Sequence, residues 1–126
     1  MNFIDVFINY INLGLTHVIP FGFDHILFIL SLILLGNSIK TLLIQCSVFT
    51  IAHSFTMTIA TLGYIIPNPN IIEPLIAISI LYASIENIVI ENPNRMRYIV
   101  VFSFGLIHGL GFANALNEIG LPKTDF

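Results

Sequence analysis

Five ionisable side chains interrupt long apolar stretches of this sequence, and their types are those that bind transition metals. They are Asp24, His25, His53, Glu86 and His108. Imidazole and carboxylate groups are ligands for nickel, cobalt, zinc and iron, and the order of metal affinities does not choose among these ions. The residue types therefore indicate a metal or proton site. A structural interpretation competes with it, in which buried His, Ser and Glu side chains hydrogen-bond one another and fix the helix packing.

The spacing of the polar residues predicts that they share helix faces. One polar seam, with steps of three and four residues, contains Thr50, His53, Ser54, Met57 and Thr61. A comparable seam in the next apolar stretch contains Ser79, Ala83, Glu86, Asn87 and Ile90. A charged group at the centre of a bilayer costs a few kcal/mol. We therefore expect both seams to face the interior of a helix bundle.

The depth of each ionisable residue along its helix predicts one common site. At ~1.5 Å of rise per residue, His53 and His108 lie near the middle of their helices, and Asp24 and His25 lie near the outer end of theirs. Glu86 lies deeper, in a second layer or in contact with His53 or His108. We predict that these five residues are metal ligands in one intramembrane site.

Further polar residues are predicted to lie around these ligands or to gate access to them. They are His17, Thr50, Ser54, Glu73, Ser79 and Asn87. Two interpretations are open for His17, which is an outer gate ligand or a surface imidazole. Glu73 would also stabilise the N-terminus of its helix. Arg95 and Arg97 are interpreted as topology signals and headgroup anchors.

Three glycines near His108 predict a tight contact between helices. Gly105 and Gly109 form a GxxxG pattern, and Gly111 follows. Small residues at this spacing let another backbone come close. The pattern fits a contact within the bundle as well as a contact with a second copy of the chain, and the sequence leaves both open.

The composition indicates that lipid is the main solvent of this chain. Its 126 residues are 56% hydrophobic and 9% charged, and its mean hydropathy is +0.95. Soluble domains average about 25% charged residues, so a soluble or disordered chain is disfavoured. The net charge of -3, with four Lys and Arg in total, excludes the basic surface of a nucleic-acid binder. The single cysteine, Cys46, cannot form an internal disulfide.

Four apolar runs predict an all-α fold, a polytopic transmembrane helix bundle that forms a single integral membrane domain over residues 1–126. A span needs about 20 apolar residues, and its backbone groups must be paired within the helix. The expected spans cover residues 18–35, 41–66, 71–90 and 98–116. Residues 2–15 are amphipathic and predict an additional N-terminal helix, at the interface or packed on the bundle.

Basic residues between the spans predict the orientation. Lys40 follows the first span, and Arg95 and Arg97 lie between the third and fourth. The positive-inside rule places both loops in the cytoplasm, which puts the N-terminus outside. The first 39 residues hold no Lys or Arg, so a cleavable signal peptide is not expected.

Several strings, in this order, resemble the HupE/UreJ family of membrane proteins and within it a second branch. They are GFDHILF (22–28), FTIAHS (49–54), EPLIAIS (73–79), EN (86–87) and FGLIHGLGFA (104–113). The resemblance extends from about His17 to Pro122. It implies a multi-pass protein of the bacterial inner membrane. The better-studied members are nickel or cobalt permeases associated with hydrogenase and urease maturation.

In those members a His-x5-Gly-x-Asp-His element carries the metal-handling residues. Asp24 and His25 match this element, whereas His17 stands one position closer to the glycine. His53 and His108 match the His-Ser and His-Gly motifs of the second branch, and their metal role is our inference. Family members usually continue beyond the Leu-Pro segment with further spans, so we expect this chain to be either a fragment or a C-terminally shortened member.

The expected function is that of a permease for nickel or cobalt, or a metal-handling accessory of hydrogenase or urease maturation, rather than an enzyme. The expected partners are the lipid bilayer, the metal ion, a second copy of the chain or maturation proteins. One alternative is an intramembrane zinc metallohydrolase in which Ser54 or Glu86 assists an activated water. The sequence lacks a His-Glu-x-x-His element, which disfavours it. Another alternative is a non-catalytic membrane assembly subunit.

Overall fold

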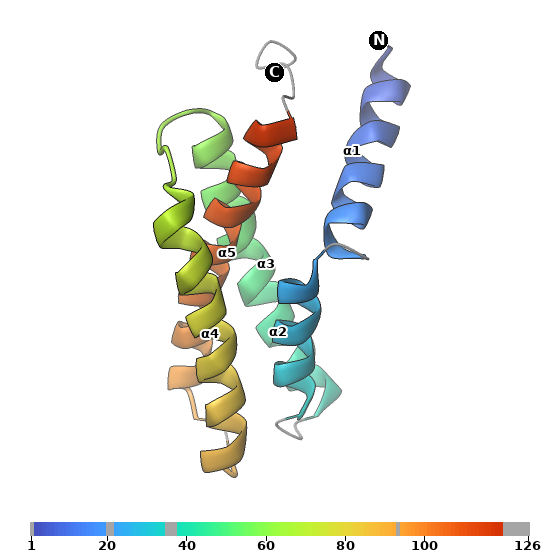
Figure 1. Cartoon of the computed structure of the whole chain (residues 1–126). Coiled ribbons are helices and arrows are strands. Elements are labelled where there is room, and N and C mark those ends of the chain that lie inside the picture. Colours follow the sequence, from blue (N-terminus) through green and yellow to red (C-terminus); the bar gives the residue numbers. More distant parts are fainter. Residues whose placement is uncertain (1, 20–21, 35–37, 93, 120–126) are drawn as a thin grey trace.

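The computed structural model describes residues 2–19, 22–34, 38–92 and 94–119, and every regular element in these ranges is an α-helix. Figure 1 shows the helices in chain order: α1 (Phe3–Val18), α2 (Phe23–Leu34), α3 (Ile39–Thr61), α4 (Pro69–Val89) and α5 (Met96–Ile119). The predicted all-α class is confirmed.

Capping side chains, a proline and a glycine define several helix ends. Asn2 and Asp5 form a reciprocal capping box at the start of α1, which satisfies two backbone N–H groups. Asn68 caps α4 and is followed by Pro69, whose fixed φ suits the first helical position. Beyond α3 the chain turns at Gly63, with φ of +84°. This left-handed conformation is one that glycine adopts without steric cost.

Three helices, α3, α4 and α5, are long and apolar enough to cross a bilayer within the described residues. Helices α1 and α2 pass the same test only as a pair bent by 64°. Helix α2 has 12 residues, about 18 Å at ~1.5 Å per residue, which is short of the ~30 Å hydrocarbon core. One straight span over residues 18–35 was expected. The structure instead has two helices, α1 up to Val18 and α2 from Phe23, which pass the test for a span only together. The prediction of a multi-pass membrane protein is confirmed.

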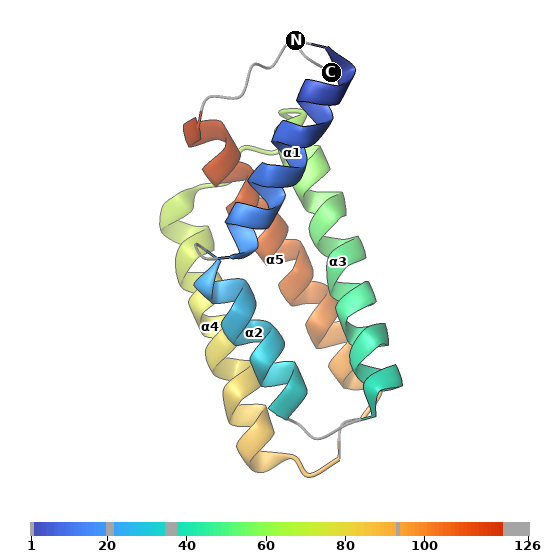
Figure 2. The same cartoon turned by 90° about the vertical axis from the view of Figure 1, so that its right-hand side faces the viewer.

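The four helices α2 to α5 form the bundle, and α1 extends away from it (Figure 1). Helices α3 and α5 run in the same direction, while α2 and α4 run the opposite way (Figure 2). Helix α5 packs against α3 and α4, and α2 packs against α4 and α3. None of the described side chains of α1 is buried.

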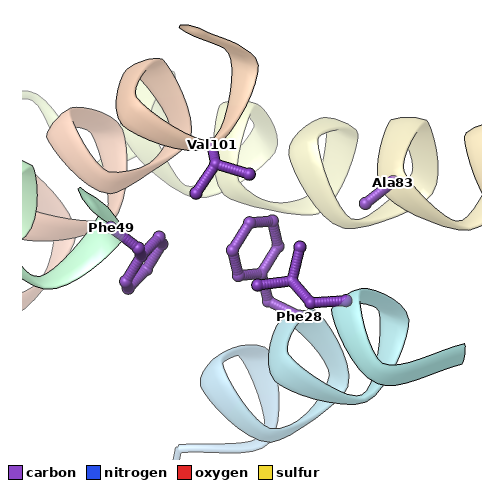
Figure 3. Close-up of a cluster of buried hydrophobic side chains, with 5 residues drawn as sticks. Phe28, Phe49, Ala83 and Val101 are labelled. Carbon is purple, nitrogen blue, oxygen red and sulfur yellow. The ribbon is translucent and has the colours of Figure 1, made fainter. Parts of the chain in front are cut away.

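The apolar core lies where all four bundle helices meet. It contains Phe28, Leu32, Phe49, Ala83 and Val101 (Figure 3). Phe28 and Phe49 are in direct ring contact, with their centres 4.9 Å apart. The outer faces carry many exposed aliphatic side chains. This distribution is the one expected for a bundle whose surroundings are lipid.

The GxxxG pattern makes a contact within the chain, between α5 and α3. A Cβ atom added at Gly105 would lie 2.6 Å from the carbonyl oxygen of Phe49. A Cβ atom at Gly109 would collide with the Thr56 hydroxyl and the His53 carbonyl. Both glycines are therefore required for the close approach of the two backbones.

Two further contacts fix α5 in the bundle. The hydroxyl of Thr56 in α3 donates a hydrogen bond to the carbonyl of Leu106, at 2.8 Å. On the α4 side, a Cβ atom added at Gly111 would lie 2.6 Å from the Ile76 side chain. The third glycine of the pattern thus belongs to the α4 contact.

The buried face of α3 differs from the polar seam predicted for it. Its buried residues are Gln45, Phe49, Ala52, Thr56 and Ala60. Thr50 and Ser54 are exposed, and His53 is half-buried. The hydroxyl of Thr50 donates to the Cys46 carbonyl of its own helix at 2.8 Å. A hydroxyl that is satisfied in this way can face lipid, so the prediction that Thr50 and Ser54 face the interior was wrong.

Arg97 is buried, so its interpretation as a headgroup anchor was also wrong. The Arg97 Nη1 atom donates to Glu86 Oε2 at 2.9 Å, and Nε donates to Gln45 Oε1 at 3.4 Å. The guanidinium group stays inside because a carboxylate balances its charge there. Glu86 accordingly pairs with a cation of α5 and does not hydrogen-bond to an imidazole.

Candidate functional site, a cluster of four histidines

Four histidines from four helices lie together, with His25 at the centre. The ring centre of His25 is 4.9 Å from that of His17, 5.3 Å from that of His53 and 5.4 Å from that of His108. In each pair the ring planes are nearly perpendicular, at 75–86°. We call these four residues the histidine cluster. It brings together three of the predicted metal ligands and the predicted outer residue His17.

Two glycines allow the helices to bring these rings together. A Cβ atom added at Gly22 would collide with the His17 carbonyl and would lie 2.8 Å from Val18 Cα. Position 22 therefore has space for glycine only, and the close approach of Gly22 to the end of α1 accompanies the contact of His17 with His25. Gly109, next to His108, packs on the backbone of His53, so the α3–α5 contact places His108 close to His53.

Phenylalanine rings surround the cluster. Phe112 lies 3.8 Å from His17 and 6.0 Å from His53, measured between ring centres. Phe49 lies 5.2 Å from His108 and 5.8 Å from His53. These apolar walls limit the access of water to the imidazoles, which strengthens any polar interaction made inside.

Each imidazole of the histidine cluster has one buried nitrogen with no hydrogen-bond partner in the described part of the chain. These atoms are Nε2 of His17, Nε2 of His25, Nδ1 of His53 and Nδ1 of His108. A buried polar atom left unpaired costs about 1–3 kcal/mol. A neutral imidazole nitrogen is also a common metal ligand. The unpaired nitrogens are therefore donor atoms available to a ligand.

The separations of His25 from each of the other three rings are compatible with an ion shared by that pair. Two imidazoles bound to one tetrahedral ion at ~2.1 Å have ring centres roughly 5 Å apart. However, no three His, Cys, Asp or Glu residues of the described ranges are arranged to hold one ion. Metal binding would thus require these side chains to rearrange.

The carboxylates predicted as ligands lie elsewhere. Asp24 is exposed in the first turn of α2, where a negative charge is favourable to the helix dipole. Glu86 is paired with Arg97. Glu73, predicted as a gate or outer residue, is exposed on α4. The available donors of the cluster are therefore neutral imidazoles.

Among the other polar residues predicted near the ligands, only Ser79 is hydrogen-bonded to the cluster. Its hydroxyl oxygen lies 3.0 Å from His108 Nε2. Asn87 instead donates to the Ser31 carbonyl at 2.6 Å, which links α4 to α2. Thr50 and Ser54 lie on the outer face of α3.

Sequence reasoning did not identify the contributions of Phe112 and Gln45. Phe112 lies four residues after His108, so helical spacing places both on one face. That spacing could have identified Phe112 as a neighbour of His108 on the inner face of the helix. Gln45 lies four residues before Phe49, and it accepts the Nε hydrogen bond of Arg97. Its role depends on a partner in another helix, for which the local sequence carries no signal.

A family model described as HupE / UreJ protein matches residues 1–126, the whole chain. The chain belongs to the HupE/UreJ family. This family is associated with nickel and cobalt transport. No curated protein and no solved structure matches the chain. The resemblance found in the sequence strings is thereby confirmed, and with it the membership in a family of membrane proteins.

Proposed function

We propose that this HupE/UreJ protein carries a divalent transition-metal ion, nickel or cobalt, through the membrane as a permease, and that the ion passes through the histidine cluster. The observation that carries the proposal is the meeting of four imidazoles from α1, α2, α3 and α5, each with an unpaired buried nitrogen. Nickel and cobalt accept imidazole nitrogen readily. The metal is therefore the cargo, and a rotation of the rings brings the donors onto it.

Neutral donors suit a site that must release its cargo. A transport site has to bind an ion well enough to admit it and weakly enough to let it leave. The exposed position of Asp24 and the pairing of Glu86 with Arg97 keep carboxylates off the imidazoles. The cluster then binds through imidazole alone, and Asp24 acts on the ion only as a nearby charge.

The cellular setting of this proposal is the inner membrane of a bacterium, with the N-terminus outside. Lys40 and Arg95 are exposed at the beginning of α3 and just before α5, and basic loop residues favour the cytoplasmic side. Metalloenzyme maturation proteins that receive nickel or cobalt are the expected cytoplasmic recipients. Handing the ion to them would make the chain an accessory of hydrogenase or urease maturation.

The test is equilibrium dialysis of the detergent-purified chain against Ni²⁺ and Co²⁺, followed by elemental analysis. We expect stoichiometric metal in the wild type and its loss in a His53→Ala/His108→Ala variant. Thr50→Ala/Ser54→Ala is the matched control, because it changes two polar residues of α3 that face outward, and it should bind as the wild type does.

Two other results would overturn the proposal in different ways. Stoichiometric zinc together with hydrolysis of an added lipid or peptide would support the intramembrane metallohydrolase. Absence of any bound metal would leave the histidine cluster as a packing feature of a non-catalytic assembly subunit. Uptake of Ni²⁺ or Co²⁺ into proteoliposomes then tests transport itself, and the double histidine variant should abolish it.

A further inference from the structure

We propose that Ser79 is a positioning residue that fixes the tautomer of His108 and so leaves its buried Nδ1 atom as a bare lone pair. This inference rests on the proposed function for its consequence in metal binding. Its chemical basis, however, is a hydrogen-bond arrangement of the metal-free protein, which can be tested separately.

Ser79 is one of the most buried polar residues of the bundle, with 1% of its surface exposed. Its hydroxyl lies within hydrogen-bond distance of two groups. The carbonyl oxygen of Ile76, in the same helix, is 2.6 Å away. The Nε2 atom of His108, in α5, is 3.0 Å away.

Counting protons assigns the direction of both bonds. A serine hydroxyl has one proton to donate and can accept through its oxygen, whereas a carbonyl oxygen can only accept. The proton of Ser79 therefore goes to Ile76. The bond with His108 then requires Nε2 to be the donor, so Nε2 carries the proton of the imidazole.

The assignment determines the state of the other ring nitrogen. In a neutral imidazole one nitrogen is protonated and the other carries a lone pair. With the proton on Nε2, the Nδ1 atom of His108 is unprotonated. It is also the buried atom of this residue that has no hydrogen-bond partner in the described ranges. A hydrogen-bond partner that holds one ring nitrogen in this way orients the other nitrogen as a metal ligand.

The surrounding rings restrict the alternative, a flip of the imidazole that would exchange its nitrogens. Phe28 and Phe49 lie 5.4 and 5.2 Å from His108 between ring centres. His25 lies at 5.4 Å. His108 is 1% exposed, so a full flip of its ring is disfavoured, and the hydroxyl of Ser79 selects between the two flip states. The residue therefore determines which nitrogen of His108 meets a cation.

The first measurement uses the metal-free chain with ¹⁵N-labelled histidine, in detergent. The nitrogen chemical shifts separate protonated from unprotonated ring nitrogens, and a His108→Ala spectrum assigns the signals. We expect a protonated Nε2 and an unprotonated Nδ1 at His108. A protonated Nδ1 in the wild type would overturn the proposal, whatever the metal measurements give.

The second measurement compares Co²⁺ affinity, followed by the visible absorption of bound Co²⁺, in three variants. Ser79→Ala should weaken binding about 10- to 100-fold, the usual effect of losing a residue that hydrogen-bonds to a metal-binding histidine, and should alter the nitrogen shifts of His108. Ser79→Thr keeps the hydroxyl and should restore both. Ser84→Ala is the matched control, because that exposed hydroxyl of α4 donates only to its own helix, to the Ile80 carbonyl.

The outcomes separate this inference from the proposed function. Wild-type protein that binds no Co²⁺ contradicts the proposed function, while the nitrogen shifts still decide the tautomer. Unchanged shifts and unchanged affinity in Ser79→Ala would reject Ser79 as a positioning residue, even if the wild type binds the metal well. Equal losses in Ser79→Ala and Ser84→Ala would do the same, since a general loss of helix stability would explain both.

Discussion

Arg97 and Glu86 form an ion pair of 2.9 Å inside the bundle, with 1% and 8% of their side chains exposed. Arg97 lies in the first turn of α5 and Glu86 one turn before the end of α4. Each charge thus lies at the helix end whose dipole disfavours it. Mutual attraction has to offset both the dipoles and the loss of hydration, so either charge is costly to keep buried without the other.

Removal of one partner of this pair should therefore be more harmful than removal of both. We expect Glu86→Ala or Arg97→Ala to lower the free energy of unfolding by about 3–5 kcal/mol, because each leaves an unpaired buried charge. The double variant Glu86→Leu/Arg97→Met should lose clearly less. Unfolding in mixed micelles, followed by helical circular dichroism, measures the difference.

The control for the ion pair is Glu91→Ala, which removes an exposed carboxylate just beyond α4. It should change the stability by no more than about 0.5 kcal/mol. If the double variant is as unstable as the single variants, apolar side chains do not substitute for the pair, and the explanation by unpaired charge is wrong.

The pairing of Glu86 illustrates what the local sequence could not reveal. The prediction that Glu86 is buried on the inner face of its helix was correct, because helical spacing groups it with Ser79 and Ala83. Its partner could not be chosen in this way. Arg97 reaches it only because α4 and α5 pack side by side after an intervening turn, and the positive-inside rule had assigned that arginine to the membrane surface.

Alanine substitutions at two glycines should separate the effect of steric fit on stability from the effect of helix propensity. Gly109→Ala would place a methyl group against the His53 carbonyl and the Thr56 hydroxyl. We expect a loss of about 1–3 kcal/mol from overpacking, and weaker metal binding because α5 moves away from α3. Gly14→Ala is the control, since no atom lies within 4 Å of a Cβ at that position.

The two alanine substitutions are predicted to have opposite signs. Gly14→Ala should stabilise its helix by up to about 1 kcal/mol, because alanine has the higher helix propensity. Thermal unfolding of both variants in the same detergent gives the comparison. A neutral or stabilising Gly109→Ala would mean that the α3–α5 contact relaxes easily and does not fix the position of His108.

The rotation of α3 about its axis shows a second limit of sequence reasoning. The predicted seam grouped residues by polarity, which is a reliable guide when water is the solvent. In lipid, the Thr50 and Thr58 hydroxyls bond to carbonyls one turn earlier, at 2.8 and 2.7 Å. These hydroxyls are then satisfied by their own helix, so their positions no longer show which face of α3 points into the bundle. The inner face is selected by packing against Gly105 and Gly109, a relationship between two helices.

The meeting of the histidines was, by contrast, accessible from the sequence. An imidazole has two ring nitrogens, and one helix backbone cannot satisfy both of them as it satisfies a hydroxyl. His53 and His108 both lie near the middle of their helices, α3 and α5, as helix geometry predicts. The orientation of the rings depends on the surrounding phenylalanines and on Ser79, and this was not predictable.

Metal binding should weaken in acid. An imidazole must be unprotonated to bind a metal, so protons compete with the ion for the same nitrogens. We expect the Co²⁺ affinity to fall as the pH is lowered from neutral into the acid range, and titrations in detergent across this range measure it. Glu91→Gln should have the same pH profile as the wild type. A flat profile would contradict binding by the histidines.

His25 and Asp24 are neighbours in sequence with different expected roles. His25 is in ring contact with the other three histidines, whereas Asp24 is exposed. If the ion is bound by imidazoles, His25→Ala should reduce Co²⁺ binding more than the loss of any other member of the cluster, at least 100-fold. Asp24→Asn keeps the side-chain size and should weaken binding less than about tenfold, through the loss of a nearby charge that attracts the ion.

Salt dependence distinguishes the two roles of these neighbours. A long-range attraction from an exposed carboxylate is screened by salt, so the effect of Asp24→Asn should shrink as the salt concentration rises. The effect of His25→Ala should not change, because direct coordination is not screened. Titrations of both variants at low and high salt provide the comparison. An equally large, salt-independent loss in Asp24→Asn would make that carboxylate a direct ligand, and the site would then include the α2 terminus instead of imidazoles alone.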